Sequence, residues 1–290
     1  MTTTTILSFL LLSFLCFQTA YAIDPGRVQG TLKINNETIE LKEAYAHFHD
    51  NAEGLLDRPK EIRIVLADRR IPQESLRGIA FLPVTTLAKE GNVRGLLLQF
   101  DPGDQGKMVV TILRAPSRQG TSLTTISRVD TGQKLFKNLA ISKTRVGGET
   151  EYAEKGSPDS ESFPGISYSV KFSAPLFNEL PVTADLKGKA AQDSPQAKVL
   201  REKINALKKG DFDAVKRLST QRANRRIDLL LTQMGADQAK IFAQEAAKEE
   251  EQSLKSIKRI VVRGSTAVMI FSKNAWSSFA QEDGQWKSDN

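Results

Sequence analysis

Hydrophobic and polar residues alternate along several short segments of the chain between residues 28 and 174. Such alternation predicts strands with one buried face, because successive side chains of a strand point to opposite sides. The segments cover residues 28–34, 37–48, 61–67, 95–101, 107–113, 134–142 and 166–174. Turn-forming residues separate several of them, notably Asn35-Asn36 and the stretch from Pro102 to Gly106. Many short strands joined by turns predict a β sandwich or an open barrel.

Other parts of this half depart from the alternation. Short helical patterns are expected at Gln73–Ile79 and Val84–Glu90, and the polar stretch from Gly147 to Gly165 is expected to be a long exposed loop. The sequence from Asp101 to Asp104 lacks the alternating oxygen ligands and the distant Glu of a calcium loop. We therefore interpret it as a hairpin turn.

The composition changes near residue 183. Residues 183–196 are small, polar and turn-forming, which is typical of an interdomain linker. Helical periodicity replaces strand alternation beyond this point. The sequence therefore predicts a β-rich domain over residues 23–182, a linker over 183–196 and a second domain over 197–290.

The second domain carries clear signals for the ends of its helices. Ser194 is a candidate N-cap followed by Pro195, and Gly210 can end that helix. Asp211 can cap the next helix, and Gly235 can end a third. Apolar residues recur at helical spacing between these signals: Ala197, Leu200, Ile204, Leu207, Val215, Leu218, Ile227, Leu230, Leu231 and Met234. Each helix is thus expected to bury one face.

Alternation returns at residues 257–264, 266–272 and 275–281, and the chain closes with Glu282-Asp283-Gly284 before Gln285-Trp286-Lys287. Residues 200–220, 257–271 and 278–289, with Gly210-Asp211 at the helix boundary, resemble the nuclear-transport-factor-like, or SnoaL-like, cone domains. The resemblance implies a curved sheet wrapped on helices, with a cavity at its wide end. Because such domains serve as enzymes, ligand binders and interaction modules, it implies a fold rather than an activity. The expected class is α+β: an N-terminal β-rich sandwich or open barrel joined to a C-terminal helix-on-curved-sheet domain.

The N-terminus has the pattern of an export signal. Residues 6–17 are apolar, and this run is shorter than the ~20 residues that a membrane-spanning helix needs. Ala20-Tyr21-Ala22 follows and provides the small residues that signal peptidase accepts. We expect a signal peptide over residues 1–22, cleavage after Ala22, and a periplasmic or extracellular protein without a transmembrane segment in its mature chain.

Composition narrows the chemistry further. The single cysteine, Cys16, lies in the signal, so the mature chain is expected to have neither disulfides nor thiol chemistry. The net charge of +7 allows an anionic polymer or an envelope protein as a partner, whereas export argues against nucleic acid. The sequence implies no cofactor.

The two histidines of the chain are the sharpest candidate site. On the predicted strand His47 and His49 share a face, beside Tyr45. Two imidazoles and a carboxylate could hold zinc or another transition metal. Candidate third ligands are Asp50, Asp57 and Asp68. The alternative is a strand end whose histidines form local hydrogen bonds.

A second candidate site is an anion-binding cluster of Arg222, Arg225 and Arg226. Arginine binds phosphate and carboxylate groups well. Further basic residues of this domain are Lys255, Lys258, Arg259 and Arg263. The alternative is a solvated face whose charges pair with acids such as Asp228.

The sequence argues against catalysis, because no nucleophile-elbow motif is present and the second domain has no histidine. The first hypothesis is therefore a non-enzymatic binding or interaction module of the cell envelope or extracellular space. The alternative is a small-molecule or metal-binding protein that uses the C-terminal cavity or the His47/His49 pair.

Overall fold

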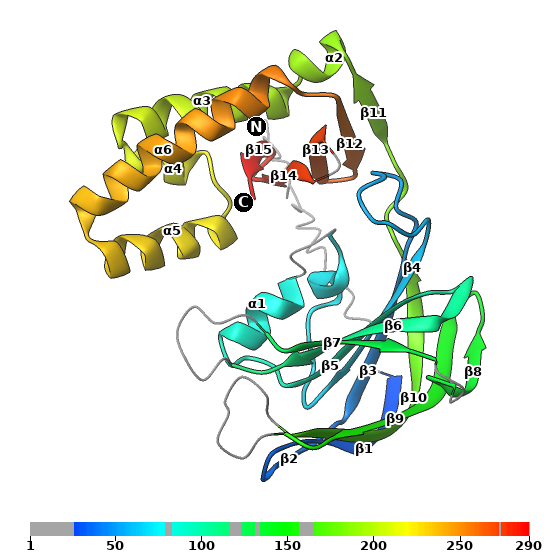
Figure 1. The fold of residues 1–290 in the computed structure, drawn as a ribbon. Helices are drawn as coiled ribbons and strands as arrows, with labels where there is room; N and C mark the ends of the chain where they lie inside the picture. The colour runs from blue at the N-terminus through cyan, green and yellow to red at the C-terminus, as the bar shows by residue number, and fades with distance from the viewer. Residues whose placement is uncertain are drawn as a thin grey trace, which may run out of the picture.

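The computed structural model describes residues 26–78, 83–115, 123–130, 134–156, 165–272 and 274–289. The expected signal peptide lies outside these residues. Two sheets and the helices that cover them make up the fold, which confirms the α+β, β-rich class. Figure 1 shows the larger sheet curving in the lower half of the molecule and the smaller sheet with its helices above it. Within the described part, no helix has both the length and the apolar character to cross a membrane.

The larger sheet has ten strands in the order β7-β6-β5-β4-β3-β1-β10-β9-β8, with β2 paired to β1. The strands are β1 (Gly26–Ile34), β2 (Glu37–Glu40), β3 (Glu43–His49), β4 (Glu61–Ala67), β5 (Gly95–Asp101), β6 (Asp104–Leu113), β7 (Thr125–Val129), β8 (Lys137–Ile141), β9 (Arg145–Glu154) and β10 (Ile166–Asn178). Neighbours are antiparallel, except that the end of β10 also pairs in parallel with β3. One curved sheet is thus present instead of two stacked ones, as the open-barrel alternative expects.

The concave face of this sheet encloses the main core, to which residues such as Leu32, Phe100 and Phe172 belong. A second apolar cluster on the opposite face of the central strands packs against η1 (Gln73–Leu76) and α1 (Pro83–Lys89). Every residue of β4 is therefore buried. The two short helices were expected near these positions, although Ile79 lies outside the described residues.

Close backbone contact accompanies the curvature of β1. Gly30 has a φ of 137°, and a Cβ there would lie 2.1 Å from the Ser169 carbonyl oxygen. Only glycine can therefore occupy this position. The hairpin turn at Asn35 is confirmed by its φ of 53° between β1 and β2. The Asp101 turn between β5 and β6 is confirmed as well, with its carboxylate accepting from Gly103 N at 2.7 Å.

The expected exposed loop over residues 147–165 is wrong for its first half. Strand β9 continues to Glu154 and pairs with β10, with Thr150 opposite Val170 and Tyr152 opposite Tyr168. Beyond Val146, the inward positions of β9 are Gly148, Thr150 and Tyr152 instead of aliphatic residues, so this segment does not show an apolar alternation. Residues 157–164 lie outside the described part.

The smaller sheet is antiparallel, in the order β11-β12-β13-β14-β15. Its strands are β11 (Ala184–Lys187), β12 (Arg259–Arg263), β13 (Thr266–Ser272), β14 (Ala275–Glu282) and β15 (Gln285–Ser288). The helices are α2 (Lys189–Gln192), α3 (Pro195–Lys209), α4 (Phe212–Arg217), α5 (Gln221–Met234) and α6 (Ala236–Lys255). Residues 183–196, expected to be a linker, form the edge strand β11 and the helix α2 instead, because Leu186 and Ala191 pack into this second core.

The helix ends follow the sequence signals. Ser194 Oγ accepts from Ala197 N at 3.1 Å and Asp211 Oδ1 accepts from Ala214 N at 2.9 Å. Gly210 has a φ of 66° and ends α3. Apolar side chains of α3, α6 and the sheet form one core, which Trp286 contacts from β15. These helices cover one side of the small sheet (Figure 1).

Candidate functional site

The two histidines lie at the end of β3 with both rings buried. They face the same side, as their spacing predicts, because both approach one oxygen of Glu179. Nδ1 of His49 lies 3.0 Å from Glu179 Oε2, and Nε2 of His47 lies 3.4 Å from the same atom. Glu179 follows β10, whose Phe177 pairs with His47 in the parallel register. Sequence reasoning missed Glu179, because it is 130 positions from His49 along the chain.

Arg263 connects this cluster to the smaller sheet. Its Nε donates to Glu53 Oε1 at 2.7 Å, and its guanidinium also bonds to Asp50. Glu53 Oε2 in turn lies 3.7 Å from Nε2 of His49. We call these residues the junction network: His47, His49, Asp50, Glu53, Glu179 and Arg263. It joins the larger sheet to β12 through buried ion pairs.

Burial sets the charge of one member of the junction network, and close contacts set that of another. It lowers the pKa of His47 to about 3, and the nearby charge of Arg63 adds to the effect of burial, so this ring is neutral at neutral pH. Burial raises the pKa of Glu179, but the hydrogen bond from His49 and the neighbouring rings outweigh it and hold that pKa at about 2. Glu179 is therefore ionised.

The metal hypothesis for His47 and His49 gains no support from this geometry. Among the residues described, no group of three or more His, Cys, Asp or Glu is placed to hold a metal ion. Two of the candidate third ligands bond to arginines instead: Asp50 to Arg263, and Asp68 to Arg69 and Arg94. A guanidinium neutralises a carboxylate as a metal cation would. The contacts are those of a buried ion-pair junction.

The cluster of Arg222, Arg225 and Arg226 lies on α5. Arg222 forms a two-pronged ion pair with Asp289, with Nε 3.2 Å from Oδ1. Burial and the neighbouring charge of Arg222 lower the pKa of Arg226, which is half-buried. Arg225 is exposed. Since one of the three charges is already neutralised, the anion-binding hypothesis for this cluster stays a prediction that the contacts do not favour.

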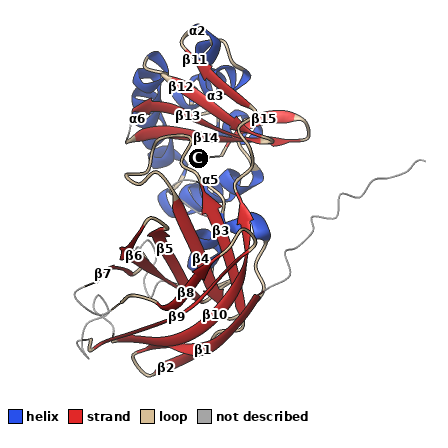
Figure 2. Ribbon diagram, turned by 90° about the vertical axis from the view of Figure 1, so that its right-hand side faces the viewer, coloured by secondary structure: helices blue, strands red, loops and turns tan. Residues whose placement is uncertain are grey.

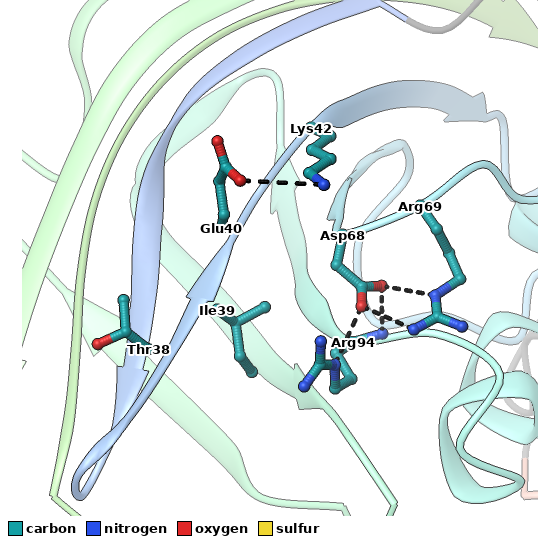
Figure 3. A pocket seen from close by; sticks show the side chains of 7 residues that line it. All are labelled: Thr38, Ile39, Glu40, Lys42, Asp68, Arg69 and Arg94. Carbon is teal, nitrogen blue, oxygen red and sulfur yellow. Dashed lines mark hydrogen bonds and ion pairs between the residues drawn. The ribbon is translucent and has the colours of Figure 1, made fainter.

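A hollow of about 450 Å³ lies beside β2 and the loop after β4. Figure 3 shows Asp68 between Arg69 and Arg94, with Lys42 paired to Glu40 nearby. Arg94 Nε and Arg69 Nη2 each lie 3.0 Å from Asp68 Oδ2. Lys42 Nζ is 3.9 Å from Glu40. The cations of this hollow thus already have carboxylate partners within it.

Two further hollows, of about 370 and 830 Å³, adjoin one another at β9 and β10, and both are lined by Glu151 and Ser169. We call them together the β9–β10 groove. Its lining also comes from β1, β7 and β8. Figure 2 shows β1, β10, β9 and β8 side by side in the lower half of the molecule. The shared residues place the two hollows next to each other.

Cations outnumber carboxylates along the β9–β10 groove. Its charged residues are Lys33, Arg128, Lys137 and Lys171, against Glu149 and Glu151. Lys137 Nζ lies 2.6 Å from Glu151, and Lys171 Nζ lies 3.4 Å from Glu149. These pairs are exposed, and exposed ion pairs contribute at most about 1 kcal/mol, so an incoming anion can compete for both lysines. Within the described part no carboxylate pairs with Lys33.

Arg128 bridges β7 and the strands across from it. Its Nη1 donates to Tyr168 Oη at 2.9 Å and approaches Thr150 Oγ1 at 3.3 Å. Its Cζ lies 4.9 Å from the centre of the Tyr152 ring, a distance at which a cation and a ring attract. Sequence reasoning missed this cluster. Its only signal is the alternation that places Tyr168 on the inner face of a predicted strand.

The hairpin of α5 and α6 exposes large apolar side chains. Leu229 is 50% exposed, Ile241 60% and Phe242 49%. Exposed apolar groups of this size are typical of protein contact surfaces. The expectation of a protein partner therefore has a candidate surface, and it stays a prediction.

No protein-family model, no curated protein and no solved structure matches the chain. The resemblance to SnoaL-like domains therefore stays a prediction.

Proposed function

We propose that the chain is a non-enzymatic exported protein that binds an extended anionic polymer along the β9–β10 groove. The observation that carries the proposal is that the two hollows share Glu151 and Ser169 and so lie next to each other along the strands. A linear polymer needs a long surface, whereas a compact ligand needs one enclosed cavity.

The charges of the groove support an anionic ligand. Lys33 and Lys171 lie on neighbouring strands β1 and β10, and Lys137 lies beyond them on β8. A chain of repeating negative charges can contact these cations at the same time, so that several weak contacts add together. The net charge of +7 raises the local concentration of such a polymer around the whole molecule.

The position of the histidines supports a non-enzymatic role. His47 and His49 are 0% and 1% exposed and belong to the junction network, so neither can reach a polymer in the groove as a general base. The signal-like residues 1–22 support export. An exported protein meets cell-wall and secreted polymers, which makes a polysaccharide or similar polymer the expected partner and nucleic acid an improbable one.

The test is a binding titration of residues 23–290 with fluorescently labelled polygalacturonate, with neutral dextran as the control polymer. The groove variant is Lys33→Ala with Lys171→Ala. The matched control is Lys198→Ala with Lys209→Ala on α3, which removes the same charge from exposed positions elsewhere. Each surface charge contact contributes about 1 kcal/mol, so the groove variant is expected to lose about tenfold or more in affinity. Equal losses in both variants would reduce the interaction to net charge and contradict the proposed groove.

A further inference from the structure

The second half of α5 carries apolar side chains that the rest of the chain leaves uncovered. The structure describes all of this helix, and Ala223, in its first turn, is its one buried residue. Leu229 and Leu230 are 50% and 40% exposed. An amphipathic helix gains most of its stability by burying its apolar side chains. These leucines therefore indicate a contact that a single chain does not make.

The first half of α6 also carries exposed apolar side chains. Ala243 and Ala247 pack into the second core, whereas Ile241 and Phe242 are 60% and 49% exposed. Because Gly235 joins the two helices, the exposed residues of both lie toward this turn. Figure 1 shows α5 and α6 meeting at one end of the helical layer.

Opposite charges accompany the apolar residues on the two helices. Arg225 lies four residues before Leu229, and Glu245 lies four residues after Ile241, so each charge shares a helix side with its apolar neighbour. Arg225 and Glu245 are both exposed, and neither forms an ion pair in the part of the chain that the structure describes. Over its whole length α5 has three arginines and one aspartate, whereas α6 has five carboxylates and three lysines.

This arrangement is complementary to itself. Along α5 the charge precedes the apolar residue, and along α6 it follows the apolar residue at the same spacing. Two such helices match when they lie antiparallel, with apolar residue against apolar residue and cation against carboxylate. A lipid surface would instead need cations around the apolar residues, and the carboxylates of α6 would be repelled by anionic lipids. The charges thus favour a second copy of this chain as the partner.

We infer that the α5–α6 hairpin is the contact surface of a homodimer, in which α5 of each copy lies antiparallel along α6 of the other. Leu229 of one copy meets Ile241 of the second copy, and Arg225 meets its Glu245. A two-fold axis repeats both contacts, so that each substitution acts twice. This inference goes beyond polymer binding and does not depend on it.

The first test is the molecular mass of residues 23–290 by sedimentation velocity over a wide concentration series. The mass is expected to rise from monomer to dimer with concentration. Leu229→Ser with Ile241→Ser should weaken the dimer about tenfold or more, because it removes four apolar side chains from the contact. The matched control is Ile141→Ser with Val182→Ser, which removes two aliphatic side chains that are each 39% exposed elsewhere. A monomer at every concentration, or equal losses in both variants, would overturn the inference.

Charge reversal tests the antiparallel pairing itself. Arg225→Glu places carboxylates opposite one another in both contacts, and Glu245→Arg places guanidinium groups there, so each variant alone should dissociate about tenfold more readily. An equimolar mixture of the two variants should restore the dimer, because each contact of the mixed pair again joins a cation to a carboxylate. Circular dichroism confirms that each variant is folded.

A mixture that dissociates as readily as its two components would refute the pairing of α5 with α6. The groove variant Lys33→Ala with Lys171→Ala should leave the mass unchanged. The homodimer and the proposed polymer binding can therefore fail independently.

Discussion

Protonation of His47 should make the protein less stable in mild acid. The folded protein holds this ring neutral, with a pKa of about 3, whereas an unfolded chain has the ordinary value of about 6.5. Between these two values the unfolded state binds more protons than the folded state, so stability rises with pH in that window and falls as the pH drops through it. The stability that depends on the neutral His47 ring is therefore fully present above about pH 6.5.

The size of the effect at pH 5 depends mainly on the unfolded state. Almost all unfolded chains carry the proton there, while almost no folded molecules do. Linkage then gives a loss of about 2 kcal/mol between pH 8 and pH 5 from this one ring. Because pH 5 lies well above the folded-state pKa, almost the whole loss comes from protonation of the unfolded chain.

The assay is urea unfolding followed by circular dichroism at pH 8, 7, 6 and 5, for the unaltered protein and His47→Gln. The variant cannot titrate, so its stability should fall by about 2 kcal/mol less over this range than that of the unaltered protein, whatever its stability at pH 8. Glu179 adds little to this difference, because its pKa of about 2 and its ordinary value both lie below pH 5. Parallel pH profiles for the two proteins would refute the assignment of a neutral buried ring.

Other contacts give simpler expectations for the same unfolding assay. Arg263→Ala leaves the buried Glu53 without its ion-pair partner and should cost about 3–5 kcal/mol; a loss below about 1 kcal/mol would show that the pair is not buried in solution. Gly30→Ala places a Cβ against the Ser169 carbonyl at a positive φ and should cost at least about 2 kcal/mol, whereas an unchanged midpoint would contradict the close approach of β1 and β10. Ser194→Ala removes the N-cap of α3 and should cost about 1 kcal/mol, with Ser194→Asp restoring most of it.

Local signals in the sequence were sufficient to predict the helix ends and turns, because these depend on residues close together along the chain. Ser194, Gly210 and Asp211 mark helix ends through hydrogen bonds that span only a few residues. Asn35 forms a turn because its own backbone tolerates a positive φ. Such features need no knowledge of the tertiary fold, and they were predicted at the right positions.

Polar strands were harder to recognise, because beyond Val146 the inward positions of strand β9 are glycine, threonine and tyrosine. Its pairing with β10 over ten residue positions decides the structure there, and a single sequence does not reveal that pairing. The expected linker failed for a related reason. Residues 184–187 become a strand only because β12, more than seventy positions later, provides the partner edge.

The candidate sites also combine features that nearby residues decide with features that distant residues decide. The spacing of His47 and His49 correctly predicted a shared face, but their partner Glu179 comes from a distant part of the chain, as does Arg263, which pairs with the neighbouring Glu53. Burial keeps the His47 ring neutral, and the carboxylates near the pair form ion pairs with Arg263, so the metal hypothesis stays a prediction that the contacts do not support. Arg128 gave no signal of its own, since a lone arginine on a short strand is most often a solvated side chain.

Strand β10 links the two parts of the molecule that matter most for the proposed function. Its first residues, from Ser167 to Lys171, line the β9–β10 groove, and its last residues pair with β3 and place Glu179 between the histidines. The strand is thirteen residues long and hydrogen-bonded on both sides for most of its length. The strand therefore connects the proposed polymer-binding surface to the junction network and, through Arg263, to the smaller sheet. Under the proposed function, a polymer in the groove would lie at a defined position relative to the helices.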